Sequence, residues 1–320
     1  MNAMPDPAAG PARWSVGVFG RNEAARIGAC LRAIARAAAE VRAEAVPHVT
    51  VLLNGTTDDS PALAAAALRE AGLAGEVHQV PHADKSHALN LFLHELRPPA
   101  TLYFCIDAYA EIWPDSLRHL ARRLERQPEA LAAAAVPSSG RSADALRQGM
   151  LRHSGLHGSL FALRATFVER LASAGLRLPI GLYRGDGLLG SFLLHDLDAA
   201  KGGWEGWRIA VEPAASWTTP RWQPWRWQDL RRHLHRLVRQ GRGRLESAAL
   251  RQAIYTDGFA GLPKDADAML RDWIAADPRA RRPKLWRDPF AWLALARLRH
   301  AAPPAPDQLR PRLVLRNEAA

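Results

Sequence analysis

Residues 49–60 read VTVLLNGTTDDS, and this stretch decides the fold class of the chain. Val49–Leu53 is a short apolar run rich in β-branched residues, which predicts a buried strand. A polar turn follows, and Asp59 or Ser60 is then placed to cap a helix over Asp59–Glu70. A buried strand joined to a helix by a short polar turn is one half of a strand–helix–strand unit, which predicts a parallel sheet.

The same alternation of strand and helix continues on both sides of this stretch. Further strands are predicted at Ser15–Gly20, Glu76–Val80, Leu102–Ile106 and Leu131–Val136, and further helices at Glu23–Arg42, Ser86–Leu96 and Asp115–Arg126. Apolar strands separated by helices belong to parallel sheets with helices on both faces. The predicted fold class is therefore α/β, with a mostly parallel central sheet flanked by helices.

The second half of the chain is less regular. Its expected pieces are a polar loop at Pro137–Arg147, a strand and a helix within Gly158–Leu171, an apolar helix after Gly185-Asp186-Gly187, and a strand at Trp204–Val211. From Pro220 onward the pattern predicts basic helices, followed by a Pro-rich tail at Ala301–Arg312. The helical, basic part is expected as an extension of the sheet domain.

Composition places the chain among soluble globular proteins. Of its 320 residues, 48% are apolar and 23% are charged, which argues against wholesale disorder. No apolar run reaches the roughly 18 residues of a membrane span, and Met1–Arg13 lacks the apolar core of a secretory signal. Cys30 and Cys105 lie in apolar segments and are expected to be buried thiols in a reducing compartment. The expected location is the cytoplasm, with peripheral contact at the inner face of the membrane as a further option.

The positive charge belongs to the C-terminal part of the chain. Residues 1–200 hold 20 basic and 20 acidic residues, whereas residues 201–320 hold 23 basic and 12 acidic residues, and the whole carries a net charge of +11. A basic region favours an anionic partner, such as a phosphate-bearing substrate, a membrane surface or nucleic acid. A solvated basic surface without a partner is the alternative.

Ligands of open parallel sheets bind beyond the carboxyl ends of the strands, so the segments that follow each strand are candidates for a site. These segments are Phe19–Glu23 (FGRNE), Asn54–Ser60 (NGTTDDS), Lys85–Asn90 (KSHALN) and Asp107–Glu111 (DAYAE). Two later segments complete the set, namely Gly158–Arg164 (GSLFALR) and Arg184–Asp186 (RGD).

In this order and at these spacings, the six segments resemble the family 2 glycosyltransferases, which have the GT-A fold. The resemblance covers residues 14–217. It implies a nucleotide-sugar half over residues 14–136 and an acceptor half over residues 137–217. The Trp- and Arg-rich helical region over residues 218–320 lies outside it. The family carries an Asp-x-Asp motif after the fourth strand, and here Tyr109 stands at its second acidic position.

The resemblance implies an inverting hexosyltransferase-type enzyme. Such an enzyme moves a sugar from a nucleoside-diphosphate donor to an acceptor hydroxyl in glycan, polysaccharide or glycoconjugate biosynthesis. The acceptor is a glycan, a lipid-linked molecule or a small molecule. Asp186 corresponds to the general base of the family, although an Asp ahead of a helix is also typical of an N-cap. The residues expected on the acceptor side are His157, Gly158 and Arg184.

The donor side is expected to lie along the first strand ends. The residues implied to bind the nucleotide sugar are Phe19, Arg21, Glu23, Asn54, Asp58, Lys85 and Asp107. Lys85 begins a predicted helix, where the helix dipole disfavours a cation, and this suggests a phosphate partner. A surface lysine is the alternative. Leu53 replaces an Asp that commonly contacts the nucleoside in the family, so the base is left open.

A divalent cation is implied at Asp107, because Mg²⁺ or Mn²⁺ bridges the acidic motif of the family to the diphosphate. Tyr109 leaves three interpretations open. Asp107 holds the metal together with Glu111 or His195; basic residues replace the metal as a phosphate clamp; or catalysis is lost. In the last case the chain is a non-catalytic partner subunit that binds a nucleotide or a glycan.

Residues 221–244 combine eight arginines with three tryptophans, and their Leu residues fall on one helical face. Gln228, Arg231 and Arg232 form a partial match to the Gln-x-x-Arg-Trp motif of membrane-embedded processive synthases. Arg231 and Arg232 are therefore candidates for phosphate or membrane contact. The alternative is a helix that packs on the sheet domain and leaves a solvated basic face. Nucleic acid is ranked last, because it leaves the first 200 residues unexplained.

Overall fold

A computed structural model describes residues 11–140, 142–200, 203–219, 227–298 and 302–318 of the chain, except for the side chains of residues 227–229 and 232. Within these residues the strands are β1 (Ala12–Gly20), β2 (Ala45–Asn54), β3 (Gly75–Val80), β4 (Leu102–Asp107), β5 (Glu111–Ile112), β6 (Ala132–Pro137), β7 (Leu160–Arg164), β8 (Ile209–Thr218) and β9 (Arg312–Asn317). The helices of the first 200 residues are α1 (Ile27–Glu40), α2 (Ser60–Glu70), α3 (Lys85–Leu91), α4 (Ser116–Arg126), α5 (Ala143–Arg152), α6 (Ala165–Ser173) and α7 (Gly185–Leu194). The later helices are α8 (Trp227–Asp257), α9 (Ala266–Ala276), α10 (Pro278–Arg281) and α11 (Pro289–Leu298).

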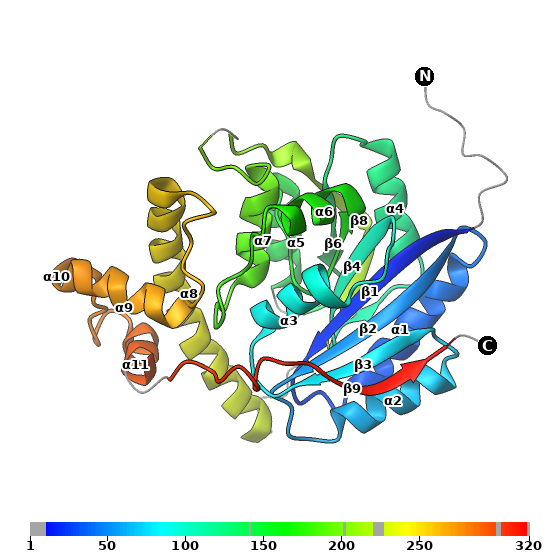
Figure 1. The fold of residues 1–320 in the computed structure, drawn as a ribbon, viewed down its shortest axis with the longest axis horizontal. Helices are drawn as coiled ribbons and strands as arrows, with labels where there is room; N and C mark the ends of the chain where they lie inside the picture. The colour runs from blue at the N-terminus through cyan, green and yellow to red at the C-terminus, as the bar shows by residue number, and fades with distance from the viewer. Residues whose placement is uncertain (1–10, 141, 201–202, 220–226, 299–301, 319–320) are drawn as a thin grey trace.

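The described strands form one sheet in the order β5-β8-β6-β7-β4-β1-β2-β3-β9. β1 pairs in parallel with both β2 and β4, and β2 pairs in parallel with β3. β7 is antiparallel to both β4 and β6, so β6 runs in the same direction as β4, and β8 is parallel to β6. Most strands therefore point the same way, which confirms the predicted α/β class with a mostly parallel sheet (Figure 1).

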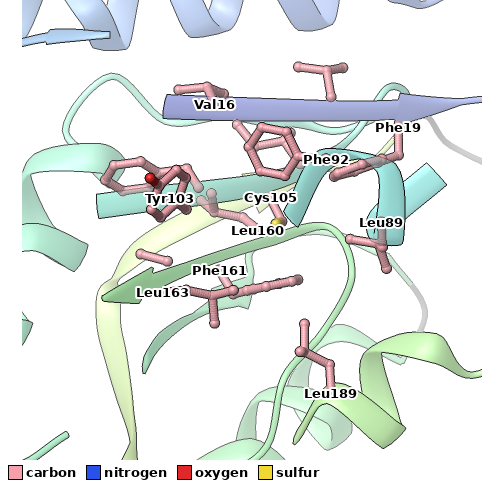
Figure 2. Close-up of a cluster of buried hydrophobic side chains, with 14 of the residues drawn as sticks. Val16, Phe19, Leu89, Phe92, Tyr103, Cys105, Leu160, Phe161, Leu163 and Leu189 are labelled. Carbon is pink, nitrogen blue, oxygen red and sulfur yellow. The ribbon is translucent and has the colours of Figure 1, made fainter. Parts of the chain in front are cut away.

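Apolar side chains from the central strands and from α3 fill one face of the sheet. Phe92, just after α3, is fully buried, and its ring meets the ring of Phe19 edge-on at 5.7 Å. A Cβ on Gly17 would approach the Phe92 ring to 2.8 Å, so a glycine here lets the ring lie flat against β1. Figure 2 shows Phe92 among Val16, Phe19 and Cys105. Full burial of such a ring stabilises the fold by about 1.5–3 kcal/mol.

Three predicted elements differ in the structure. The expected loop at Pro137–Arg147 gives way to α5 at Ala143, and the strand expected from Trp204 begins only at Ile209, after a short 3₁₀ turn. The C-terminal region was expected to be helical with a Pro-rich tail, yet Arg312–Asn317 forms β9 along the edge of β3. An unpaired sheet edge exposes a row of N–H and C=O groups, and β9 satisfies those of β3.

The region after β8 is mainly helical, as predicted. In Figure 1 α8 to α11 lie to one side of the sheet, and the chain then returns past α3 to β9. α8 is 31 residues long and crosses α11 closely at Gly241, where a Cβ would lie 2.5 Å from the backbone nitrogen of Ala291. None of the helices in the described residues combines the length and the apolar content needed to cross a bilayer.

The basic helix proposed from the sequence is only partly packed. Val238 of α8 is buried, whereas Leu230 and Leu234 are 37% and 47% exposed. Arg231 is exposed on the same helix. The side chain of Arg232, like Trp222 and Trp225, lies outside the described residues, so phosphate or membrane contact by this segment stays a prediction.

Candidate active site

The carboxyl ends of β1, β2 and β4 meet at one edge of the sheet. In the register of the sheet, Phe19 lies beside Asp107, and Gly20 lies beside Leu53. The first residues of α3 and α7 reach the same edge, because Lys85 of α3 contacts Asp107 at the end of β4 and Asp186 of α7 contacts Gly158 just before β7. The strand-end segments chosen from the sequence are therefore neighbours in space.

Asp107 is the last residue of β4, and its carboxylate is bonded on both oxygens. The residue is only 6% exposed. Its Oδ1 forms an ion pair with the Lys85 ammonium, and its Oδ2 accepts a hydrogen bond of 2.7 Å from the Tyr109 hydroxyl. Burial raises the pKa of Tyr109 well above its ordinary value, and the charge of Asp107 raises it further. Tyr109 is therefore a neutral donor that holds Asp107 in place.

Lys85, the first residue of α3, carries the cation of this cluster. Burial alone lowers the pKa of its ammonium, but the charges of Asp107 and Asp186 outweigh burial and raise it. The side chain is 37% exposed, so Lys85 is only partly covered by the protein. A lysine in this setting stays protonated at neutral pH.

Gly158 lies at the centre of the charged groups. Its backbone N–H donates a hydrogen bond of 3.0 Å to Oδ2 of Asp186. A Cβ at this position would lie 3.3 Å from Asp186 Oδ2 and 3.4 Å from Asp107 Oδ2, and it would overlap the Lys85 ammonium. Only a glycine lets two carboxylates and an ammonium approach the backbone this closely.

Asp186 lies in the first turn of α7 and is half-buried. The residue that caps the helix is Arg184, which makes no side-chain cap bond. The carboxylate of Asp186 accepts hydrogen bonds of 3.0 Å from the N–H groups of Gly158 and Gly187. One oxygen is thus directed toward Gly158 and the Lys85–Asp107 pair rather than used as an N-cap.

The loop that leads to Asp186 is held by α3. The buried carboxylate of Asp84 accepts from the Gly181 N–H at 2.8 Å, and Ser86 Oγ donates to the carbonyl of Leu182 at 2.7 Å. Asn90 makes two hydrogen bonds to the backbone of Leu178, of 2.8 and 2.9 Å. Several polar residues of the KSHALN segment and its cap therefore fix the loop, while Lys85 faces the site.

The same loop is held from its other side by α8, which the sequence did not indicate. Glu246 is fully buried, and it accepts from the Tyr183 N–H at 2.9 Å and from Arg242 Nε at 2.6 Å. Arg242 also donates to the carbonyl of Gly181 at 2.9 Å and pairs with Asp267 at 2.6 Å. Burial raises the pKa of Glu246, although the charge of Arg242 opposes the shift. In the sequence, only the four-residue spacing of Arg242 and Glu246 could have indicated this ion pair. The same spacing is typical of ion pairs on exposed helix surfaces.

His157 lies beside the charged cluster, as expected for the acceptor side. Its ring stacks on Trp217 at 5.0 Å, and Nδ1 accepts from the N–H of Ser159 at 3.3 Å. Burial lowers its pKa, although the charges of Asp186 and Asp107 oppose the shift. The imidazole is therefore neutral at neutral pH. Arg184, next to Asp186, is exposed.

Two residues predicted to bind the nucleoside form hydrogen bonds that brace the loops in this structure. Asn54 is only 5% exposed. The Asn54 amide is oriented so that both its nitrogen and its oxygen are hydrogen-bonded. The nitrogen donates to the Gly20 carbonyl at 2.9 Å, and the oxygen accepts from the Asp84 N–H at 3.1 Å. Asp58 accepts from the N–H groups of Ala24 and Ser60, each at 3.1 Å. Burial raises the pKa of Asp58, but its hydrogen bonds outweigh burial and lower it. Asn54 is therefore bonded within the protein, whereas Asp58 makes its hydrogen bonds from a half-buried position.

The three candidates after β1 divide between core and rim. Phe19 is 2% exposed and packs on Phe92, so it belongs to the core rather than to a ligand site. Glu23 forms an ion pair with Arg26 at 3.3 Å, and its N–H donates to Ser60 Oγ at 2.8 Å. Arg21 is exposed and donates from Nε to the Gly55 carbonyl at 3.2 Å.

Gly55→Ala should destabilise the protein by about 3 kcal/mol, because its φ of +60° disfavours a Cβ and because that Cβ would lie 2.3 Å from the Cβ of Ala83. Gly72→Ala is the matched control, since Gly72 has a φ of +61° but open space where its Cβ would lie. It should cost about 1 kcal/mol. Urea denaturation measures both, and equal losses would contradict a close approach at Gly55.

The other two candidate metal ligands are Glu111 and His195. Glu111 lies on β5. Burial raises the pKa of the Cys30 thiol, and the charges of Asp107 and Glu111 raise it further. His195 follows α7, nine residues after Asp186 and thus about 13 Å along the helix. The rings of Trp204, Tyr255 and Phe259 surround it at 5.5–6.3 Å.

The donor set around Asp107 does not fit a divalent cation. Mg²⁺ and Mn²⁺ prefer several oxygen ligands, with more than one carboxylate where the protein supplies most of the shell. In the part of the chain that the structure describes, no three His, Cys, Asp or Glu residues gather, but a cation that also binds a diphosphate needs only one or two carboxylates from the protein, so the fit depends on Asp107 itself. Asp107 already binds Lys85 and Tyr109 through its two oxygens.

Solved structures with the same fold are known. The chain is similar to the mannosyltransferase PcManGT from Pyrobaculum calidifontis in complex with GDP-Man and Mn²⁺, with a TM-score of 0.55 and 20% identity over 96% of this chain and 80% of that chain. It is also similar to S. aureus TarS 1-349 in complex with UDP-GlcNAc, with a TM-score of 0.51 and 14% identity over 91% of this chain and 82% of that chain.

No family model matches the sequence, and no curated protein sequence matches it. The structural likeness extends beyond the residues 14–217 that carry the motifs, because it takes in 96% of the chain. The sheet and its flanking helices are therefore those of the GT-A glycosyltransferase fold, as the sequence motifs predicted.

Proposed function

We propose that this chain is an inverting, family 2-like glycosyltransferase that moves a sugar from a nucleoside-diphosphate donor to an acceptor hydroxyl. The observation that carries the proposal is the convergence of Lys85, Asp107 and Asp186 on Gly158. This convergence lies at the carboxyl ends of parallel strands, where sheets of this type bind their ligands. The structures similar to this chain include complexes with GDP-Man and UDP-GlcNAc, which supports the same donor class here.

Asp186 acts as the general base in this proposal. Its carboxylate takes the proton of the acceptor hydroxyl while the acceptor oxygen forms a bond to the anomeric carbon. The bond from that carbon to the diphosphate oxygen breaks, and its electron pair leaves on the nucleoside diphosphate. Attack opposite the leaving group inverts the configuration in one step. Neutral His157 and exposed Arg184 line the acceptor side, where a glycan, a lipid-linked molecule or a small molecule presents its hydroxyl.

We place the reaction in the cytoplasm, in the synthesis of a glycan or glycoconjugate. Cys30 and Cys105 are buried free thiols, and this state fits a reducing compartment. The excess of basic residues after residue 200 suits an acceptor or donor that carries phosphate.

A nucleotide-binding panel tests the donor class. The purified protein is heated with UDP, GDP, CDP or dTDP and with their sugars, each in EDTA and in Mn²⁺. One nucleotide class should raise the unfolding midpoint by several degrees, because a ligand at about 100 times its Kd stabilises the folded state by about 2.7 kcal/mol. The absence of any shift under both conditions would contradict the donor site.

A second function is a non-catalytic partner subunit that binds a nucleotide or a glycan. The observation in its favour is Tyr109, which puts a neutral side chain where the family has a second carboxylate. Donor hydrolysis separates the two functions, because a transferase slowly passes its sugar to water when no acceptor is present. Nucleotide binding without any hydrolysis or transfer would favour the partner subunit.

A further inference from the structure

The Lys85 ammonium occupies the centre of the charged cluster. It pairs with Oδ1 of Asp107 and lies close enough to Gly158 that a Cβ there would overlap it. The same Cβ position is within 3.4 Å of both Asp107 Oδ2 and Asp186 Oδ2. A cation supplied by the chain itself therefore lies in front of Gly158, between two carboxylates.

Tyr109 completes this arrangement. It donates to the oxygen of Asp107 that Lys85 leaves open, at 2.7 Å, and it lies 3.5 Å from Ser159 Oγ. A third carboxylate at position 109, in addition to Asp107 and Asp186, would add a negative charge that the single charge of Lys85 does not balance. With Tyr109 neutral, the single charge of Lys85 balances Asp107. A divalent cation bound to Asp107 would meet the Lys85 ammonium as a like charge.

We propose that Lys85, held by Asp107 and Tyr109, takes the place of a divalent cation, so that the chain binds its nucleoside diphosphate in the metal-free form. This inference rests on the proposed function. It assigns the Lys85 ammonium as the positive charge that faces the diphosphate leaving group. A lysine ammonium has three N–H donors, and Asp107 accepts from one of them. The other two are available to oxygens of the diphosphate, and charge-assisted bonds of this kind are roughly twice as strong as neutral ones.

The first experiment needs no variant. Titration calorimetry measures the binding of UDP and of GDP to the protein after treatment with EDTA, and again in excess Mn²⁺. For whichever nucleotide binds, the affinity in EDTA should equal the affinity in Mn²⁺ to within about threefold. Binding seen only in Mn²⁺ would overturn the metal-free site while leaving the donor class intact. No binding in either condition would overturn the proposed function itself.

Two substitutions then test the roles of the side chains. Lys85→Met keeps the length of the side chain and removes its charge, and it should weaken binding in EDTA by about tenfold or more. Lys264→Met is the matched control, because Lys264 is exposed before α9, and its affinity should match that of the unchanged protein. Equal affinities for all three proteins would overturn the assignment of Lys85.

Tyr109→Asp places a second carboxylate in the motif and should make nucleotide binding depend on a divalent cation. In EDTA the added negative charge repels the diphosphate, so binding should weaken by about tenfold, whereas Mn²⁺ should restore it. Electron paramagnetic resonance of free Mn²⁺ provides a readout that does not depend on activity. The Tyr109→Asp variant should deplete the free-ion signal and the unchanged protein should not. Equal depletion by both would contradict the proposal.

Discussion

Asp186→Asn should lower kcat by about 10²–10⁴-fold and leave the affinity for the nucleoside diphosphate nearly unchanged. The amide keeps the shape of the carboxylate, and its oxygen can still accept from the Gly158 N–H. It cannot take a proton from the acceptor hydroxyl. Steady-state transfer rates with the donor found by the panel give kcat, and titration calorimetry gives the nucleotide affinity.

Asp272→Asn is the control for this variant, because Asp272 is exposed on α9 and its kcat should be unchanged. A fall in kcat that is matched by an equal loss of nucleotide affinity would show that Asp186 positions the donor instead. Full activity of Asp186→Asn would exclude it as the base. A residual rate that rises steeply with pH would fit attack by an acceptor that has ionised without help.

Glu246→Ala should destabilise the folded state by about 3–5 kcal/mol, the cost of breaking a buried ion pair by removing one partner. The substitution removes the carboxylate that accepts from Arg242 and from the Tyr183 N–H, and it leaves Asp267 as the remaining carboxylate beside Arg242. The loop over residues 181–183 leads directly to Asp186, so the same variant should also lower kcat. Urea denaturation measures the free energy of unfolding, and transfer assays below the unfolding midpoint measure kcat.

The control for Glu246→Ala lies on the same helix. Asp257 is exposed near the end of α8, and Asp257→Ala should change the free energy of unfolding by no more than about 0.5 kcal/mol. A Glu246→Ala protein that is as stable as this control would contradict a structural role for the buried pair. Lost stability with an unchanged kcat would mean that the loop keeps its shape without α8.

The sequence predicted that Lys85, Asp107 and Asp186 lie near one another, because parallel strands bring their carboxyl ends to one edge. Lys85, Asp107 and Asp186 are spread over about 100 residues, yet each follows a strand or begins a helix at that edge. The motif order placed Gly158 with them. The spacing alone could not say that Lys85 pairs with Asp107, because that contact depends on the direction of a long, flexible side chain.

The predictions on the nucleoside side rest on a pattern that has two physical interpretations. Asn54 and Asp58 follow a strand and carry polar groups, which is the pattern of a ligand site and also of a braced loop. Here the loops after β1 and β2 lie against each other, and their buried N–H and C=O groups use these two side chains. Phe19 differs from both. Successive side chains of a strand point to opposite faces of the sheet, and the ring of Phe19 lies on the face that packs in the core.

The contacts of α8 with the loop over residues 181–183 could not be predicted from the sequence, because they join segments that are far apart in the chain. Glu246 is 63 residues from Tyr183, and nothing local to either residue marks the contact. β9 was missed for a similar reason. A six-residue segment after a Pro-rich stretch has little tendency to form a strand by itself, and it does so because β3 offers an open edge.

The pairing of β9 with β3 also sets the order in which the sheet can be completed. Arg316 pairs with Glu76, which leaves the ribosome 240 residues earlier. At roughly 5–20 residues per second, β3 waits about 12–48 s for its partner. During that time the edge of β3 is unpaired, and it can pair with the β3 edge of a neighbouring chain on the same polysome. Slower translation should therefore lower the yield of soluble protein, and holding chaperones should matter most in this interval.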